Sequence, residues 1–119
     1  MEWSVEFTDE FGVWFRSLDD DAQRAIEAAI EKLQENGPAL GRPFVDTLTG
    51  SRLANMKELR PMSGNIRILF AFDPRRTAIL LLGGDKTGQW QAWDREAIPA
   101  AERLYAVYLV ELHQEGLLP

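Results

Sequence analysis

Cysteine is absent from the 119-residue sequence, and His113 is its single histidine. The first absence excludes disulfide bonds, iron–sulfur clusters and thiolate zinc sites, and one histidine is too few for most zinc geometries. No apolar run reaches the roughly 18 residues that a membrane-spanning helix requires, and the first residues lack the basic and then apolar stretches of a secretory signal. We therefore expect a cytoplasmic protein with no metal site, no cofactor and no membrane association.

Positive charge is also scarce: 13 Lys and Arg face 19 Asp and Glu, which gives a net charge of −6 and a pI near 4.8. General nucleic-acid binders are usually basic, so this balance argues against tight, independent binding to RNA or DNA. The basic residues are nevertheless concentrated. Residues 51–90 hold seven Lys or Arg against three Asp or Glu, whereas residues 1–50 hold four against eleven and residues 91–119 two against five. This local positive charge suggests a site for an anionic ligand.

Hydrophobic residues make up 45% of the sequence, and this content together with the length indicates one globular domain over residues 1–119. Residues 3–7 alternate between apolar and polar side chains, as a half-buried strand does. Two amphipathic helical patterns follow over residues 11–18 and 19–36, and the second stops at a glycine–proline pair. These two helices are predicted to form a hairpin that lies on a sheet.

A loop is predicted over residues 40–50. Three strands are predicted to follow it, over residues 51–60, 66–73 and 78–82. The third of these is apolar on both faces, as expected of a central strand. A polar loop over residues 86–94 then precedes a last helix, predicted to begin near Pro99 because proline is well tolerated at the first helical position. The order β-α-α-β-β-β-α is that of an α+β fold with a mostly antiparallel sheet, on which the helical hairpin and the C-terminal helix pack.

Three segments resemble, in their order and spacing, motifs of the RelE/ParE toxin superfamily, and within it the HigB-like, phage-derived branch. They are Met56–Arg60 (MKELR), Asn65–Phe72 (NIRILFAF) and Leu80–Thr87 (LLLGGDKT). Members share a strand ending in Glu-Leu-Arg, a glycine turn, a strand that opens with an arginine, and a lysine after the last strand. The resemblance implies a RelE-like fold and a toxin of a type II toxin–antitoxin system. Such a toxin inhibits translation by cleaving mRNA on the ribosome and is held inactive by a cognate antitoxin, usually of the helix-turn-helix type in this branch.

The same resemblance implies which residues carry catalysis. Arg60 and Arg67 match the two strand arginines, Lys57 matches a basic position just before them, and Lys86 matches the lysine after the last strand. The sequence also departs from the family pattern. Other members often place a tyrosine near the end of the last strand, and no tyrosine occurs in this region here, so a general base or a stacking tyrosine is not evident. The acidic pI is a second departure, because these toxins tend to be basic.

The chemistry of metal-independent RNA cleavage fits these catalytic candidates. It needs a base for the 2′-hydroxyl, an acid for the leaving 5′-oxygen, and positive donors for the phosphate. Arg60 and Arg67 could supply the donors, and cross-strand pairing would put both on the face opposite the predicted core. Lys57 and Lys86 would flank the site, where a lysine crowded by other cations releases its proton more readily and could act as acid or base. In a simpler interpretation, Arg60 and Glu58 only form a surface ion pair.

Four further residues are candidates for substrate contacts: Arg52, Arg75, Arg76 and Trp90. Each also has a structural interpretation. Arg52 could be an edge-strand charge that discourages strand pairing. Arg75 and Arg76 fall in a predicted hairpin turn, where exposure to solvent explains them. Trp90 could stack on a base, but packing over the C-terminal helix is the favoured interpretation.

Two other functions stay open from the sequence. The chain could be a ParE-like toxin that poisons a protein target without RNA cleavage, in which case the basic face is an interaction surface and no acid–base pair is needed. The missing tyrosine and the acidic pI favour this alternative. It could also be a catalytically inactive relative that only binds its antitoxin and helps to repress transcription.

Overall fold

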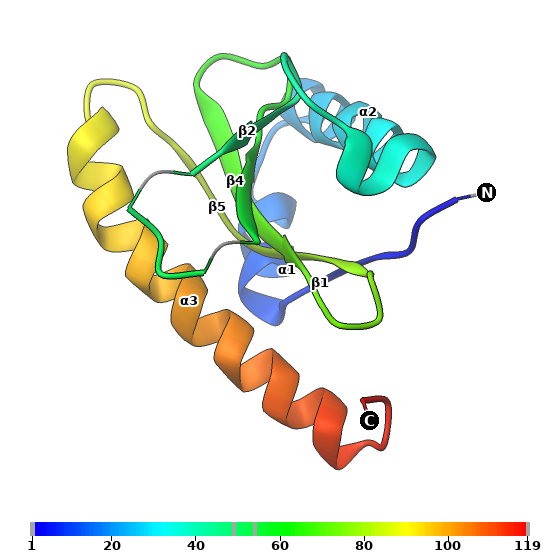
Figure 1. The fold of residues 1–119 in the computed structure, drawn as a ribbon. Coiled ribbons are helices and arrows are strands. Elements are labelled where there is room, and N and C mark those ends of the chain that lie inside the picture. Colours follow the sequence, from blue (N-terminus) through cyan, green and yellow to red (C-terminus); the bar gives the residue numbers. More distant parts are fainter. Residues whose placement is uncertain (1, 49, 54, 119) are drawn as a thin grey trace.

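The computed structural model describes residues 2–48, 50–53 and 55–118 (Figure 1). Its elements follow in chain order: β1 (Val5–Phe7), α1 (Asp9–Arg16), α2 (Asp20–Asn36), a 3-10 turn η1 (Gly37–Ala39), β2 (Val45–Thr47), β3 (Met56–Leu59), β4 (Ile66–Phe72), β5 (Ala78–Asp85) and α3 (Trp90–Gln114). Within the described part of the chain, five strands form one sheet in the order β1-β5-β4-β3-β2. Among the strand pairs of the described residues, β1–β5 is the parallel one and the other three are antiparallel. The predicted α+β fold with a mostly antiparallel sheet is therefore confirmed.

The first two helices begin at side chains that cap them. The Thr8 hydroxyl accepts a hydrogen bond from the Phe11 N–H (3.1 Å), and the Asp19 carboxylate accepts one from the Ala22 N–H (2.8 Å). Both satisfy backbone donors that a helix N-terminus leaves without an internal partner. α2 ends at Gly37, which has a φ of 58° and lies so close to the Trp3 ring that a Cβ atom would come within 2.4 Å of it. Only glycine fits both the conformation and the space.

Helices cover both faces of the sheet (Figure 1). α1 and α2 pack on one face, where Ile26, Leu33 and Phe70 are fully buried. α3 packs on the other face, against Leu69 and Leu81 among others. The prediction that β5 is apolar on both faces is confirmed, whereas for β4 only the Ile66 side was predicted to be core. β4 is also buried on both sides, so β4 and β5 form the centre of the sheet.

Two of the differences from the predicted element boundaries concern β2 and α3. The predicted loop over residues 40–50 contains β2, in which Val45 pairs with Leu59; the glycine and proline around it concealed so short an edge strand. α3 begins at Trp90 rather than near Ile98, and Pro99 lies inside it. Proline was taken as a start signal, but the residues before it are mostly helix formers. Among the described helices, none is long and apolar enough to cross a membrane.

The glycine pair of β5 lets two tryptophan rings approach the strand closely. A Cβ atom on Gly83 would come within 2.2 Å of the Trp14 ring, and one on Gly84 within 2.2 Å of the Trp93 Nε1. Successive residues of a strand point to opposite faces, so the two indoles occupy opposite sides of β5. Trp93 in turn leads to the polar site described next.

Candidate functional site

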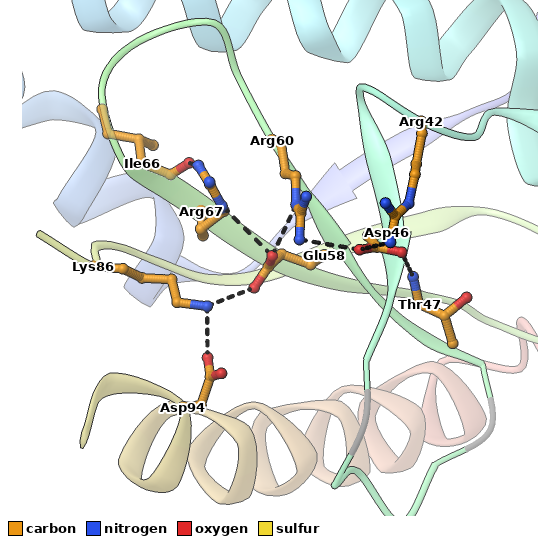
Figure 2. A network of polar contacts seen from close by, with 9 residues as sticks. All are labelled: Arg42, Asp46, Thr47, Glu58, Arg60, Ile66, Arg67, Lys86 and Asp94. Carbon is orange, nitrogen blue, oxygen red and sulfur yellow. Dashed lines mark hydrogen bonds and ion pairs between the residues drawn. The ribbon is translucent and has the colours of Figure 1, made fainter. Parts of the chain in front are cut away.

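A buried carboxylate, Glu58, lies at the centre of a group of basic side chains (Figure 2). Its side chain is only 4% exposed. Glu58 Oε1 lies 3.1 Å from Arg60 Nε and 3.5 Å from Arg67 Nε, and its Oε2 lies 3.3 Å from Lys86 Nζ. The three cations come from the end of β3, the start of β4 and the residue after β5. Segments far apart in the sequence therefore converge on one point.

The strand register explains the convergence. Leu59 pairs with Ile68 and Glu58 with Leu69, so continuing the ladder by one pair sets Arg60 opposite Arg67. Side chains that face each other across antiparallel strands lie on the same face of the sheet. The predicted cross-strand placement of the two arginines, on the face opposite Ile66 and Ile68, is confirmed.

Two more carboxylates surround the cations. Asp46 of β2 accepts hydrogen bonds from Arg42 and forms an ion pair with Arg60, each with an N–O distance of 3.0 Å, and Asp94 of α3 lies 3.0 Å from Lys86 Nζ. We call the whole set the Glu58 cluster: Arg42, Asp46, Glu58, Arg60, Arg67, Lys86 and Asp94. Four cations face three carboxylates, which leaves a net charge of +1. The positive field expected from the sequence is therefore largely neutralised within the protein.

Asp46 stays ionised readily in this setting. Partial removal from solvent raises its pKa, but the Thr47 N–H and the guanidinium groups of Arg42 and Arg60 outweigh that effect and hold the pKa below its ordinary value. Asp46 thus acts as a fixed negative charge beside the more exposed arginines.

The structure corrects two expectations about this group. Glu58 and Arg60 were considered as a surface ion pair, but Glu58 is buried, and its carboxylate meets two further cations. Lys86 was expected among other cations. Its ammonium lies instead between the carboxylates of Glu58 and Asp94, and its side chain is 8% exposed. Crowding by cations therefore does not describe the surroundings of Lys86.

Arg60 and Arg67 border a groove of about 380 Å³ beside the β3–β4 hairpin. The other wall consists of Pro61, Met62, Ser63 and Gly64 of the hairpin and of Pro43, which precedes β2. Arg60 is 35% exposed, whereas Arg67 is 13% exposed and donates from Nη1 to the Ile66 carbonyl at 2.8 Å. An anion that enters the groove would meet Arg60 first and Arg67 below it.

Lys57 does not join the Glu58 cluster. It pairs with Phe70, so its side chain lies on the opposite face of the sheet. There its Nζ is 3.5 Å from the Pro38 carbonyl and 6.0 Å from the centroid of the Phe72 ring. The structure brings together three of the four catalytic candidates and separates Lys57 from them.

The four candidates for substrate contacts are also dispersed. Arg52 is exposed in the loop before β3, and its backbone N–H donates to Glu102 Oε2 at 2.6 Å. Arg76 lies in the β4–β5 turn with its guanidinium 5.0 Å from the centroid of the Trp3 ring. Trp90 begins α3, and its side chain lies outside the described part of the structure.

Arg75 belongs to a second polar cluster, at the other end of β4 and β5. Arg75 lies 2.8 Å from Asp73 Oδ2 and 2.9 Å from Glu6 Oε1, and the Tyr108 hydroxyl donates to the same Glu6 oxygen. We call these four residues the Asp73 cluster. Arg75 is half-buried rather than fully exposed. It is also far from Arg67, because the turn lies six strand residues, or roughly 20 Å, from that arginine. It ties the β4–β5 turn to β1 and α3.

The residues that sequence reasoning missed are the carboxylates. Asp46 and Asp94 lie on β2 and on the first turns of α3, two segments that were predicted to be loops. Trp93 was not among the predicted site residues, although Lys86 Nζ lies 5.6 Å from its ring centroid. Neither of the protein's two tyrosines reaches the Glu58 cluster: Tyr105 donates to the Phe72 carbonyl, and Tyr108 donates to Glu6.

Comparison with known proteins places this geometry in context. The model of the family described as phage derived protein Gp49-like matches residues 13–106. HigB3 of Mycobacterium tuberculosis (strain ATCC 25618 / H37Rv), whose description names a toxin, is 50% identical over 103 residues that span 87% of this chain and 90% of HigB3. HigB2 of the same strain, described in the same way, is 47% identical over 112 residues that span 92% of this chain and 55% of HigB2.

Solved structures share the fold at low sequence identity. A doubly substituted Escherichia coli RelE toxin in the free state superposes with a TM-score of 0.62 and 13% identity, covering 83% of this chain and 97% of RelE. RelE in the RelE–RelB complex of Pyrococcus horikoshii superposes with a TM-score of 0.57 and 18% identity, covering 75% of this chain and 99% of that chain. At these identities the likeness shows the RelE-like fold.

Proposed function

The chain belongs to the phage-derived Gp49-like family and to the HigB-like branch of the RelE/ParE toxins, and on this premise we propose that it inhibits translation by cleaving mRNA on the ribosome. As a toxin of a type II toxin–antitoxin system, it would act as a metal-independent endoribonuclease in the cytoplasm. One observation carries the proposal. Arg60, Arg67 and Lys86 come from three separate segments and meet at one carboxylate beside an open groove.

The three cations suit the charge that develops during cleavage. Attack of the 2′-hydroxyl on the phosphate builds negative charge on the phosphoryl oxygens, and preorganised donors stabilise that charge most effectively in a site with little water. The planar guanidinium groups of Arg60 and Arg67 match two phosphate oxygens. Lys86 lies deeper and carries protons that it could donate to the leaving 5′-oxygen. The ribosome would position the mRNA, which accounts for a protein that is acidic overall.

Mapping of mRNA 5′ ends in producing cells tests the proposal. The chain would be produced from a tightly controlled promoter, beside Arg67→Ala and beside Arg24→Ala, which removes an exposed arginine of α2. We expect new 5′ ends inside translated codons with the unaltered chain and with Arg24→Ala, but none with Arg67→Ala or on an untranslated transcript. New ends that persist in Arg67→Ala would exclude this site.

A second candidate function is supported by the charge of the Glu58 cluster. The cations of this cluster are already paired with three carboxylates, and neither tyrosine reaches it. A surface that only binds a protein target needs no unpaired cation and no acid–base pair, so both observations are compatible with that function. Such a ParE-like toxin would arrest growth with intact mRNA and a DNA damage response. A chain that causes no arrest would instead be an inactive relative that only binds an antitoxin.

We also propose a cognate antitoxin as partner, of the helix-turn-helix type. The solved RelE–RelB complexes that share this fold support the general idea of such a partner. Co-purification with the product of the neighbouring reading frame tests it, and failure to form a complex when the two are produced together would refute it.

A further inference from the structure

Glu58 is the most buried charge in the Glu58 cluster, and it is the group that its innermost cations share. Both of its oxygens are occupied, one by Arg60 and Arg67 and the other by Lys86. We infer that Glu58 is a positioning residue: it holds these three cations in one arrangement beside the groove, which Arg60 and Arg67 border, and at the same time it lowers the affinity of the site for RNA. The part of this inference that concerns cleavage rests on the proposed function.

The position of Glu58 on β3 explains why a carboxylate there can orient the cations. β3 lies between β2 and β4 in the sheet, and Glu58 pairs with Asp46 on one side and with Leu69 on the other, so its backbone is held from both sides. The cations reach Glu58 from different segments, and their like charges would repel one another without it. Arg60 and Lys86 donate charge-assisted hydrogen bonds to Glu58, and such bonds hold long side chains in one geometry. Arg67 adds an ion pair with the same carboxylate. A fixed anion in the centre therefore converts three flexible cations into an ordered set.

The charge balance explains the opposing effect on affinity. With Glu58 ionised, the cluster carries four cations and three carboxylates, and replacing it with a neutral residue would raise the net charge from +1 to +2. Affinity for single-stranded nucleic acid increases with each additional cation that can neutralise a phosphate. Loss of Glu58 should thus strengthen RNA binding while it disorders the groups that stabilise the transition state.

Two substitutions separate charge from geometry. Glu58→Gln keeps the size of the side chain but removes its charge, whereas Glu58→Asp keeps the charge but withdraws the carboxylate by one methylene group. The matched control is Asp73→Asn, which neutralises a buried carboxylate beside an arginine in the Asp73 cluster, at the far end of the sheet. A purely structural role for Glu58 would make Glu58→Gln and Asp73→Asn behave alike.

The affinity of a short single-stranded RNA would be measured over a range of salt concentrations. We expect the slope of log K against log salt to steepen by about 0.7 in Glu58→Gln, because one more phosphate is neutralised, and to stay unchanged in Glu58→Asp and Asp73→Asn. Cleavage of ribosome-bound mRNA, per folded molecule, should fall about 100-fold in both Glu58 variants, since displaced catalytic groups lose about this much. It should stay unchanged in Asp73→Asn.

Each outcome decides the inference. A Glu58→Gln variant with the slope and cleavage of the unaltered chain would overturn it, as would equal behaviour of Glu58→Gln and Asp73→Asn. If Glu58→Gln does not fold, undiminished cleavage by Glu58→Asp would overturn it. If the unaltered chain cleaves no mRNA, the proposed function fails, but the charge effect is still measurable. Inorganic phosphate should then raise the melting temperature of Glu58→Gln more than that of Asp73→Asn, and equal shifts would refute it.

Discussion

The Glu58 and Asp73 clusters lie at opposite ends of β4 and β5, and both are built around a buried carboxylate that contacts arginine. They differ in their balance of charge. The Asp73 cluster has one cation, Arg75, for two carboxylates, and a tyrosine hydroxyl completes it. The Glu58 cluster has an excess of cations, two of which border a groove. Similar chemistry thus ties the chain together at one end of the sheet and leaves an anion-binding surface at the other.

Exposure follows the same division. Arg75 is 23% exposed, and each of its carboxylate partners joins a different element, so its bonds are used within the fold. Arg60 is 35% exposed and has both a carboxylate partner and a side that faces the groove. A buried ion pair is weak evidence for stability or for function. The free surface beside the pair is what distinguishes the two clusters.

Arg60→Ala should produce the largest effect. It removes one donor for the phosphate, and loss of one such donor reduces the rate by about 100-fold to 1,000-fold. Stability should change little, because Asp46 keeps Arg42 and Glu58 keeps two cations. The measurement is mRNA cleavage by purified ribosomes programmed with a defined message, beside urea unfolding of the same protein. If Arg60→Ala cleaved mRNA at the full rate, the Glu58 cluster would not differ from the Asp73 cluster in binding an anion.

Arg75→Ala should show the opposite behaviour. It leaves the buried Asp73 carboxylate without its cation, and breaking a buried pair in this way costs about 3 kcal/mol. Cleavage per folded molecule should be unchanged, since the substitution lies at the far end of the sheet. Urea unfolding measures the first effect and the ribosome assay measures the second. A variant with normal stability and lost cleavage would show that Arg75 contacts RNA, as the sequence analysis considered.

These contrasts show what the sequence could predict. The strand patterns and the Glu-Leu-Arg motif led to the fold, to the placement of Arg60 opposite Arg67, and to Lys86. They also suggested that Arg60 pairs with Glu58. They did not lead to the partners of Arg75 and Lys86, because Glu6 and Arg75 are 69 residues apart and Lys86 and Glu58 are 28 apart. A charged residue in a strand is consistent with either a surface or a buried pair. Whether the pair of Glu58 is exposed or buried depends on α3, which covers that face of the sheet.

Gly84→Ala should have an intermediate effect that is confined to the Glu58 end. The new methyl group would come within 2.2 Å of Trp93 Nε1, and overpacking of this kind costs about 1–3 kcal/mol. Because Lys86 lies against the same indole, cleavage should fall together with stability. Urea unfolding and tryptophan fluorescence test the substitution. Gly41→Ala is the matched control, because no atom lies within 4 Å of the new Cβ there. If the two substitutions lowered stability and cleavage equally, the contact with Trp93 would not explain the effect of Gly84→Ala.

Tyr108→Phe should produce the smallest effect, and only at the Asp73 end. The Tyr108 hydroxyl is the main reason that the pKa of Glu6 lies below its usual value of 4.5, with Arg75 adding to it against the opposing effect of burial. A carboxyl with a depressed pKa contributes stability that is present above the unfolded pKa and is lost as pH falls through the folded one.

The variant should therefore lose about 1 kcal/mol at pH 7 and differ less from the unaltered chain at pH 3, where Glu6 is increasingly protonated in both. Urea unfolding at the two pH values measures the difference, and Tyr105→Phe, whose hydroxyl donates to a backbone carbonyl rather than to a carboxylate, is the control. A loss for Tyr108→Phe that is equal at both pH values would show that the tyrosine acts by packing. The charge of Glu6 would then make no contribution to the stability of the Asp73 cluster.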